Sequence, residues 1–205
     1  ERRTSSASHA IREGLRDLAG TWRELRRFPQ AGLMLLAFLI YNDGVGTIIR
    51  MATAYGQEIG LAQGDLILAL VIVQLVGIPA SFAFGQLAGS IGARKAIFLG
   101  LGAYAAVSIL GYLMTSALHF FVLAGLVGLV QGGVQALSRS LFASLIPRHR
   151  SSEFFGLFAV FEKFAGILGP GLFFLANEAF GSSRPAILDV IAFFLVGGWL
   201  LARVD

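Results

Sequence analysis

The sequence predicts an all-α membrane protein, a bundle of six transmembrane helices preceded by an N-terminal amphipathic helix. Hydrophobic residues make up 56% of the chain and charged residues only 14%, whereas soluble domains carry about a quarter charged residues. The apolar runs are long and continuous, as in membrane helices and unlike the short alternating segments of membrane β-barrels. Most Lys and Arg residues lie between these runs, where they set the topology.

An amphipathic helix is predicted within residues 1–30, ahead of the first span. Its apolar residues recur every three or four positions, and arginines occupy most of the other side. The apolar residues are Ile11, Leu15, Leu18, Trp22 and Leu25, and the arginines are Arg12, Arg16, Arg23, Arg26 and Arg27. We expect this segment to lie along the cytoplasmic membrane surface, where anionic headgroups attract it. We interpret it as a basic linker helix with no activity of its own.

Six spans are predicted in the domain formed by residues 31–205, because a bilayer core of about 30 Å requires about 20 helical residues. The spans cover residues 31–55, 65–87, 96–115, 118–141, 154–180 and 185–202. The connections between them are short and polar or turn-forming, such as GQEIGLAQGD and IPRHRSSE. Basic residues concentrate in alternate connections: seven arginines precede Pro29, and Arg94 with Lys95 and Arg148 with Arg150 follow. Both termini are therefore predicted to be cytoplasmic.

A weak internal repeat relates the first and fourth spans. Gly44 precedes Arg50 by six residues, and Gly133 precedes Arg139 by the same interval. Two groups of three helices run oppositely through the membrane because three is odd, which is the arrangement of a 3+3 inverted repeat. Inverted repeats place binding sites near the midplane. The alternative is that common residues align once by chance.

The first span carries an acid deep within its apolar run. Asp43 stands about 12 residues, or about 18 Å, into the helix, and Asn42 and Gly44 flank it. An acid at that depth normally faces a bundle interior or a water-filled cavity and marks an ion or proton pathway. We therefore predict a coupling role for Asp43 rather than a purely structural one. Arg50 follows on the same face and either holds a substrate carboxylate or extends to the outer interface.

Polar residues also interrupt the fourth span. Gln131, Gln135 and Arg139 follow at four-residue intervals and form one stripe on a helix. We predict that Gln131 and Gln135 face the transport cavity and that Arg139 is an interfacial anchor.

In the fifth span, the adjacent Glu162 and Lys163 point about 100° apart, so each requires a partner elsewhere. Asp43 is an available acid for Lys163. A Lys that exchanges partners or a Glu that gains and loses a proton could couple ion and substrate movement. Gly166 and Pro170 follow the pair and are expected to permit bending.

Several classes of function are disfavoured. The chain holds no cysteine and only three scattered histidines, so we expect no metal centre, disulfide or other cofactor. The basic residues are not gathered on one polar face, so nucleic acid is not an expected partner. An intramembrane protease would need a serine and a histidine at matching depth. Ser108 and Ser138 lack that context, and His119 lies at a loop.

The connection after the second span, GQLAGSIGARK, carries the most specific short motif. It resembles the signature loop of the major facilitator superfamily, Gly-x-Leu-x-Asp-Arg/Lys-x-Gly-x-Arg/Lys-Arg/Lys. The matching residues are Gly85, Leu87, Gly92, Arg94 and Lys95. Gly89 and Ser90 replace the Asp and the basic residue after it, so the charge-relay part of the motif is not matched. The resemblance implies that the chain is the C-terminal half of a twelve-span transporter.

Two longer stretches, YNDGVGTIIRMATAYG and GGVQALSRSLFASLIPRHRSSEFFGLFAVFEKFAGILGP, resemble the vacuole-effluxer branch of that superfamily. Fungal members of this branch export amino acids from the vacuole. The resemblance implies alternating-access transport of a small polar solute, an amino acid for instance, with proton coupling as the default expectation. It also implies an integral protein of a bacterial inner membrane, whose partners are solute, protons, lipid and an N-terminal six-helix half. The fragment alone is expected to self-associate. A non-transporting, self-associating membrane scaffold or sensor is the alternative.

Overall fold

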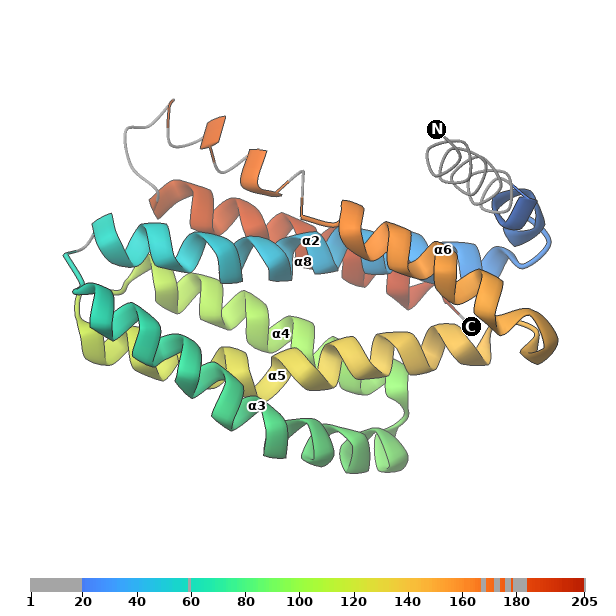
Figure 1. Ribbon diagram of the computed structural model, residues 1–205, viewed down its shortest axis with the longest axis horizontal. Coiled ribbons are helices and arrows are strands. Elements are labelled where there is room, and N and C mark those ends of the chain that lie inside the picture. Colours follow the sequence, from blue (N-terminus) through green and yellow to red (C-terminus); the bar gives the residue numbers. More distant parts are fainter. Residues whose placement is uncertain are drawn as a thin grey trace, which may run out of the picture.

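A computed structural model of the chain describes residues 20–58, 60–166, 169–171, 174–175, 178 and 184–204, and no strand occurs among them (Figure 1). The elements are α2 (Pro29–Glu58), α3 (Gln63–Ile91), α4 (Ala93–Tyr112), α5 (Ala117–Ser144), η1 (Arg148–Arg150), α6 (Ser151–Phe164) and α8 (Arg184–Ala202). Most of the predicted amphipathic helix, residues 1–19, lies outside the described residues, and only its helical end from Gly20 onward is seen.

Five segments of the described chain are long and apolar enough to cross a membrane. They are Pro29–Glu58, Gln63–Ile91, Ala93–Tyr112, Ala117–Ser144 and Arg148–Gly171. The described apolar part of α8, Val190–Ala202, is shorter than a full span. The first four predicted spans and the helix over residues 185–202 agree with the observed helices to within about one turn. A sixth membrane crossing and the inverted repeat remain predictions.

The fifth predicted span differs from the structure because its helix is interrupted. Residues 154–180 were expected to form one helix, but α6 ends at Phe164. Ala165 adopts an extended conformation with ψ of 121°, and Gly166 takes a φ of 110° that favours glycine. The described residues Gly169 to Gly171 are helical again. The backbone at residues 165 and 166 therefore breaks the helix, so backbone groups at the break require partners from outside α6.

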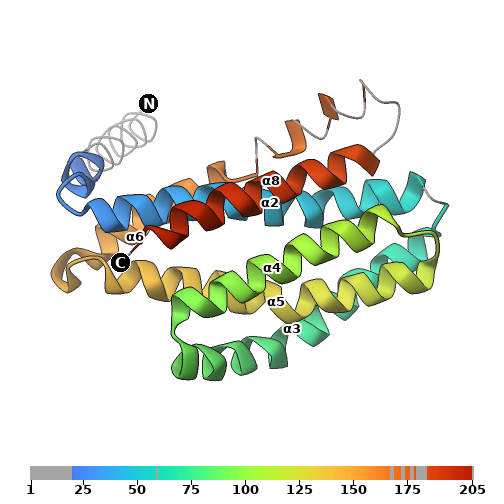
Figure 2. The same cartoon turned by 180° about the vertical axis from the view of Figure 1, so that it is seen from behind.

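The helices lie side by side along the long axis of the molecule in both views (Figures 1 and 2). The main packing pairs are α3 with α5 and α2 with α8, and α4 packs against both α5 and α8. Glycines permit the closest approaches, since a Cβ added to Gly128 on α5 would lie 2.8 Å from the Val73 carbonyl oxygen of α3. A Cβ on Gly197 of α8 would lie 2.7 Å from the Tyr41 Cβ of α2.

Aromatic rings hold α6 against the bundle. The Phe158 ring of α6 stacks on Phe38 of α2 with 4.3 Å between centroids, and it lies 5.1 Å from the ring of Phe142 on α5. All three side chains are buried. Burying such rings stabilises the contact by several kcal/mol in total, at about 25 cal/mol per Å² of apolar surface. This cluster fixes the middle of α6, one turn before the polar residues of its last turn.

The outward face of α3 is strongly apolar. Ile67, Leu75, Ile78 and Phe82 are each more than half exposed within this chain. A contiguous apolar surface of this kind is suited to lipid or to another protein surface, and not to water. It supports the assignment of the chain as an integral membrane protein.

Candidate functional site

The carboxylate of Asp43 lies at the break that follows α6. Its side chain is 1% exposed, and Oδ2 accepts a hydrogen bond of 2.6 Å from the backbone N–H of Gly169. Its Oδ1 accepts a second hydrogen bond, from the backbone N–H of Gly166. A negative charge is stabilised by such N–H groups because a helix start exposes them without intrahelical partners. The buried acid therefore supports the interrupted backbone directly.

Two further residues of α2 contact the same segment. The Thr47 hydroxyl donates to the Asp43 carbonyl at 2.8 Å, and a Cβ on Gly169 would lie only 1.7 Å from that hydroxyl oxygen. Arg50 donates from Nη1 to the Gly166 carbonyl at 2.7 Å. Asp43, Thr47 and Arg50 recur at helical spacing on one face of α2. We call these three residues the α2 clasp, because together they hold the break against α2.

A polar pocket of about 370 Å³ lies beside the clasp, between α2, α5 and α6. It is lined by Asn42, Val45, Gly46, Ile49, Arg50, Gln135, Arg139, Glu162, Lys163 and Ala165. The structure thus brings together five of the seven predicted transport residues, namely Asn42, Arg50, Gln135, Glu162 and Lys163. These residues come from three helices, and α2 is far from α5 and α6 in the sequence.

The pocket carries an excess of positive charge. Its lining includes three cations, Arg50, Arg139 and Lys163, against the single carboxylate of Glu162. Arg139 binds Glu162 with 2.6 Å between Nη2 and Oε1, so the partner that Glu162 requires is on α5. This contact adds to the interfacial role predicted for Arg139. Because Arg139 neutralises the charge of Glu162, the positive charges of Arg50 and Lys163 remain to attract an anionic group.

Lys163 was considered as a partner for Asp43. The structure places the exposed Lys163 in the lining of the polar pocket and directs both Asp43 oxygens to backbone N–H groups at the break. The sequence contained a partial signal for this arrangement, because Gly166 and Gly169 indicated bending after the charged pair. It contained no signal for the acid itself being the group that holds the bend.

Gln131 is half-buried, and its Oε1 atom receives no hydrogen bond within the described part of the chain.

The same helix also carries a contact that the sequence analysis did not predict. Tyr41 of α2 lies 2.6 Å from the Ser138 hydroxyl of α5, and Ser138 donates to the Val134 carbonyl at 2.6 Å. The Tyr41 hydroxyl is therefore the donor to Ser138. This buried pair connects α2 and α5, two of the three helices that line the pocket.

The loop that matches the superfamily signature connects α3 to α4 with a sharp turn. Gly92 takes a φ of 90°, which glycine adopts without strain, and α4 begins at the next residue. Gly85 and Lys95 are exposed, and Leu87 is half-buried. The Arg94 guanidinium donates to the Val204 carbonyl just after α8. The loop thus contacts the residues that follow α8.

A second cavity, of about 120 Å³, lies among α2, α3, α4, α5 and α8. Its lining is mainly apolar and includes Leu66, Val73, Met114 and Phe120. A cavity of this character binds small apolar molecules or remains dry. It is therefore unsuited to a polar solute.

Membrane-length apolar helices packed around a charged pocket define a polytopic integral membrane protein. The comparison with known proteins narrows this class. The chain belongs to the family described as vacuole effluxer Atg22 like, whose sequence model matches residues 1–205. The predicted resemblance to the vacuole-effluxer branch is confirmed. The family consists of transport proteins and not of enzymes.

Relatives occur in bacteria and fungi. The "Uncharacterized MFS-type transporter YxiO" of Bacillus subtilis (strain 168) is 38% identical over 196 residues, covering 96% of this chain and 46% of that protein. "Autophagy-related protein 22-1" of Aspergillus niger is 25% identical over 206 residues, covering 93% of this chain and 34% of that protein. "Autophagy-related protein 22" of Yarrowia lipolytica is 27% identical over 215 residues, covering 100% of this chain and 36% of that protein. The chain therefore spans between about a third and a half of these relatives' lengths.

Proposed function

We propose that this chain is the C-terminal six-helix half of a secondary transporter that moves a small polar solute by alternating access. The membership in an effluxer family and the similarity to a protein named as an MFS-type transporter support transport as the general activity. The coverage of 46% of the Bacillus relative supports a half-transporter. The polar face of this half meets an N-terminal half, and the two rock about a site near the midplane.

The polar pocket is the observation that carries the proposal. Its volume of about 370 Å³ is at the small end of the range for ligand pockets, about 300–1,000 Å³. Arg50 and Lys163 suit a solute carboxylate, because charge-assisted hydrogen bonds are stronger than neutral ones. The amide groups of Asn42 and Gln135 can accept hydrogen bonds from a solute ammonium group. An amino acid carries both groups, so it is the substrate class that fits this lining.

Glu162 is the best candidate for proton coupling. Its side chain is 27% exposed and binds Arg139, so water can reach it and its cationic partner can move. Adding a proton to the carboxylate removes the charge that holds Arg139, which frees the guanidinium for other contacts in the pocket. Asp43 is 1% exposed and binds backbone N–H groups, so it is better suited to holding the break than to exchanging protons with water.

The membrane orientation follows from the basic connections. Arg94 with Lys95 and Arg148 with Arg150 belong to connections on the same side as the N-terminal arginines, and the positive-inside rule assigns that side to the cytoplasm. Both termini are then cytoplasmic. The similarity to a Bacillus protein supports a bacterial inner membrane as the location. An isolated half exposes its polar face and self-associates, since polar groups are costly against lipid.

Transport is tested with the full-length protein reconstituted into liposomes. A panel of radiolabelled amino acids is offered with and without an imposed pH gradient, and empty liposomes are the control. The proposal predicts uptake of at least one amino acid and faster accumulation when a proton gradient is present. Uptake at the same rate with and without the gradient would contradict proton coupling but not solute transport. No uptake of any solute by folded protein would favour the membrane scaffold or sensor.

A further inference from the structure

The segment that precedes α2 is docked along α6. The Trp22 ring stacks on Phe161 with 5.6 Å between centroids and an angle of 16° between planes. The Phe28 ring meets Phe154 edge-on with centroids 5.8 Å apart. Thr21, which precedes Trp22, and Leu25, which follows it by three residues, are only 4% and 5% exposed. We name Thr21, Trp22, Glu24, Leu25 and Phe28 the α6 brace.

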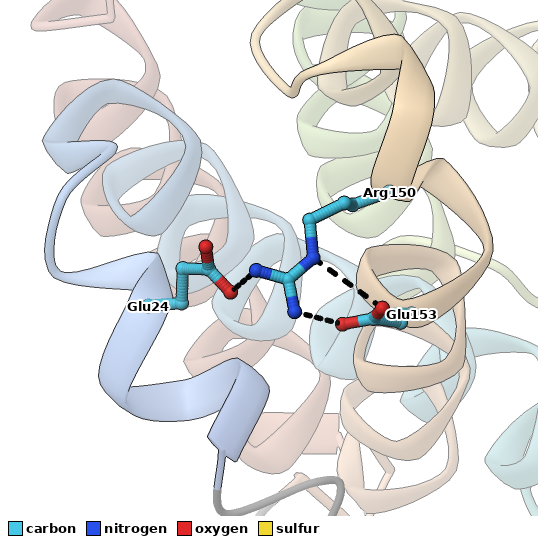
Figure 3. A network of polar contacts seen from close by, with 3 residues as sticks. All are labelled: Glu24, Arg150 and Glu153. Atoms are coloured by element: carbon cyan, nitrogen blue, oxygen red, sulfur yellow. Dashed lines mark hydrogen bonds and ion pairs between the residues drawn. The ribbon is translucent and has the colours of Figure 1, made fainter.

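A charged contact joins the brace to the beginning of α6 (Figure 3). Arg150 donates from Nε and Nη2 to the two carboxylate oxygens of Glu153, at 3.3 and 2.9 Å. Its remaining Nη1 donates to Glu24 of the brace. One guanidinium therefore binds both carboxylates, and its planar shape fixes their relative positions. The Glu24 side chain is 22% exposed, which limits screening by solvent.

The brace contacts α6 at both ends. Arg150 directly precedes α6, Phe154 belongs to its first turn, and Phe161 belongs to the last turn before the helix ends at Phe164. A short rigid helix that is held at both ends is restrained in tilt and in rotation. Glu162 directly follows Phe161, so any rotation that moves the Phe161 ring also moves the Glu162 carboxylate toward or away from Arg139.

We infer that Trp22 and Glu24 are positioning residues for Glu162, which they hold in the polar pocket by fixing the rotation of α6. The inference goes beyond the linker role predicted from the sequence. The expected effect of Trp22 and Glu24 on solute transport rests on the proposed function. Their expected effect on the geometry of the polar pocket does not. Neither side chain lines the polar pocket, so any effect on the pocket must pass through α6.

The first test uses a cysteine in the pocket as a reporter. This chain contains no cysteine. Gln135→Cys therefore provides a single reporter once any cysteines elsewhere in the full-length protein are replaced. The rate of its modification by a soluble thiol reagent is measured in the purified protein. Trp22→Ala is expected to change that rate about three- to tenfold, the range that positional coupling produces. Trp22→Phe retains an aromatic ring on Phe161 and should restore the original rate.

Trp199→Ala is the matched control, because Trp199 of α8 is also half-exposed, and its ring contacts the Arg203 guanidinium and no aromatic ring of α6 among the described residues. It should leave the modification rate unchanged. Glu24→Gln retains the size of the side chain while removing its charge, and it should shift the rate in the same direction as Trp22→Ala. If Trp22→Ala protein does not fold, Glu24→Gln decides the question. Unchanged rates in folded Trp22→Ala or Glu24→Gln protein would overturn the inference.

A transport arm separates this inference from the proposed function. Wild-type protein that moves no amino acid would contradict the proposed function, and the modification rates would still decide whether the brace positions the pocket. If transport is observed, Trp22→Ala should raise the KM for the solute by about three- to tenfold while Trp199→Ala leaves it unchanged.

Discussion

The carboxylate of Asp43 accepts a 2.6 Å hydrogen bond from the backbone N–H of Gly169, 126 residues further along the chain. Asp43, the acid that the sequence predicts to lie deep in the membrane, therefore stabilises a helix break. Arg50, on the same face of α2, binds the Gly166 carbonyl at that break and also lines the polar pocket. Binding of a solute carboxylate at Arg50 would compete with this carbonyl, because a charged acceptor is the stronger partner. Under the proposed function, the clasp would connect solute binding to the interrupted helix.

Asp43→Asn should destabilise the protein. The amide retains one acceptor oxygen but turns an NH₂ group toward backbone donors, so one N–H at the break loses its partner. The expected cost is about 1–3 kcal/mol of unfolding free energy. It is measured as a lower thermal or denaturant midpoint of the purified full-length protein. Asp65→Asn in the first turn of α3 is the control and should cost less than about 1 kcal/mol.

A double-mutant cycle with Lys163→Met distinguishes two structural roles for Asp43. If the acid mainly holds backbone groups, the effects of Asp43→Asn and Lys163→Met on unfolding free energy add to within about 0.5 kcal/mol. Recovery of stability in the double variant would show instead that the acid acts through an ion pair with Lys163.

Gly169→Ala should disturb the break by overpacking. The added methyl group would lie 1.7 Å from the Thr47 hydroxyl oxygen and 2.9 Å from its Cβ, so α2 and the segment must separate. We expect a loss of about 1–3 kcal/mol of stability. Gly171→Ala is the matched control, because an added Cβ there has no atom within 4 Å among its surroundings. Equal stability of the two variants would contradict the tight contact. Thr47→Ala should partly rescue Gly169→Ala, since it removes the hydroxyl.

Lys163→Gln should weaken solute binding without destabilising the fold. The side chain is exposed and lines the polar pocket, so the loss of its charge removes an attraction for a solute carboxylate. The expected rise in KM is about tenfold, with the thermal midpoint unchanged. Arg148→Gln, which removes an exposed cation that does not line the pocket, should leave KM as it was. A KM that is insensitive to Lys163 would exclude this residue from solute recognition.

Glu162→Gln should separate proton coupling from solute exchange. The amide is nearly the same size as the carboxylate but cannot gain or lose a proton. Accumulation driven by a pH gradient should therefore fall to the background of empty liposomes, while exchange of labelled for unlabelled solute continues. Glu178→Gln, at an exposed position, provides the control. Gradient-driven accumulation that persists in Glu162→Gln protein would assign coupling to another group.

The membrane orientation is tested by cysteine labelling of the full-length protein in intact cells and in inside-out membrane vesicles, which expose the outer and the cytoplasmic side respectively. A cysteine at Ser90, near the end of α3, should react with an impermeant thiol reagent only from the cytoplasmic side. A cysteine at Gln63, at the start of the same helix, should react only from outside. Labelling of Ser90→Cys from outside would reverse the proposed topology.

Local signals in the sequence were strong for the helices and weak for their contacts. The apolar runs predicted α2 to α5 and α8 to within about one turn, because helix length in a membrane follows from hydrophobic thickness. Asn42, Gln135 and Glu162 were identified because polar side chains within apolar runs need a polar environment. Their convergence in one pocket depends on three helices packing together, and no single helix encodes that arrangement.

The sequence by itself determined the membrane class, the boundaries of α2 to α5 and α8 to within about one turn, the family and the polar residues that the interior must accommodate. Only the tertiary structure decided which groups those residues bind: backbone N–H groups at a helix break for Asp43, and Arg139 for Glu162. It also decided that the segment before the first span is docked on α6, where Trp22 stacks on Phe161. The physical reason is that helix formation depends on hydrogen bonds between near neighbours in the chain. Partner choice depends on which helix faces pack together, and these faces are separated by 23 residues for Arg139 and Glu162 and by 126 residues for Asp43 and Gly169.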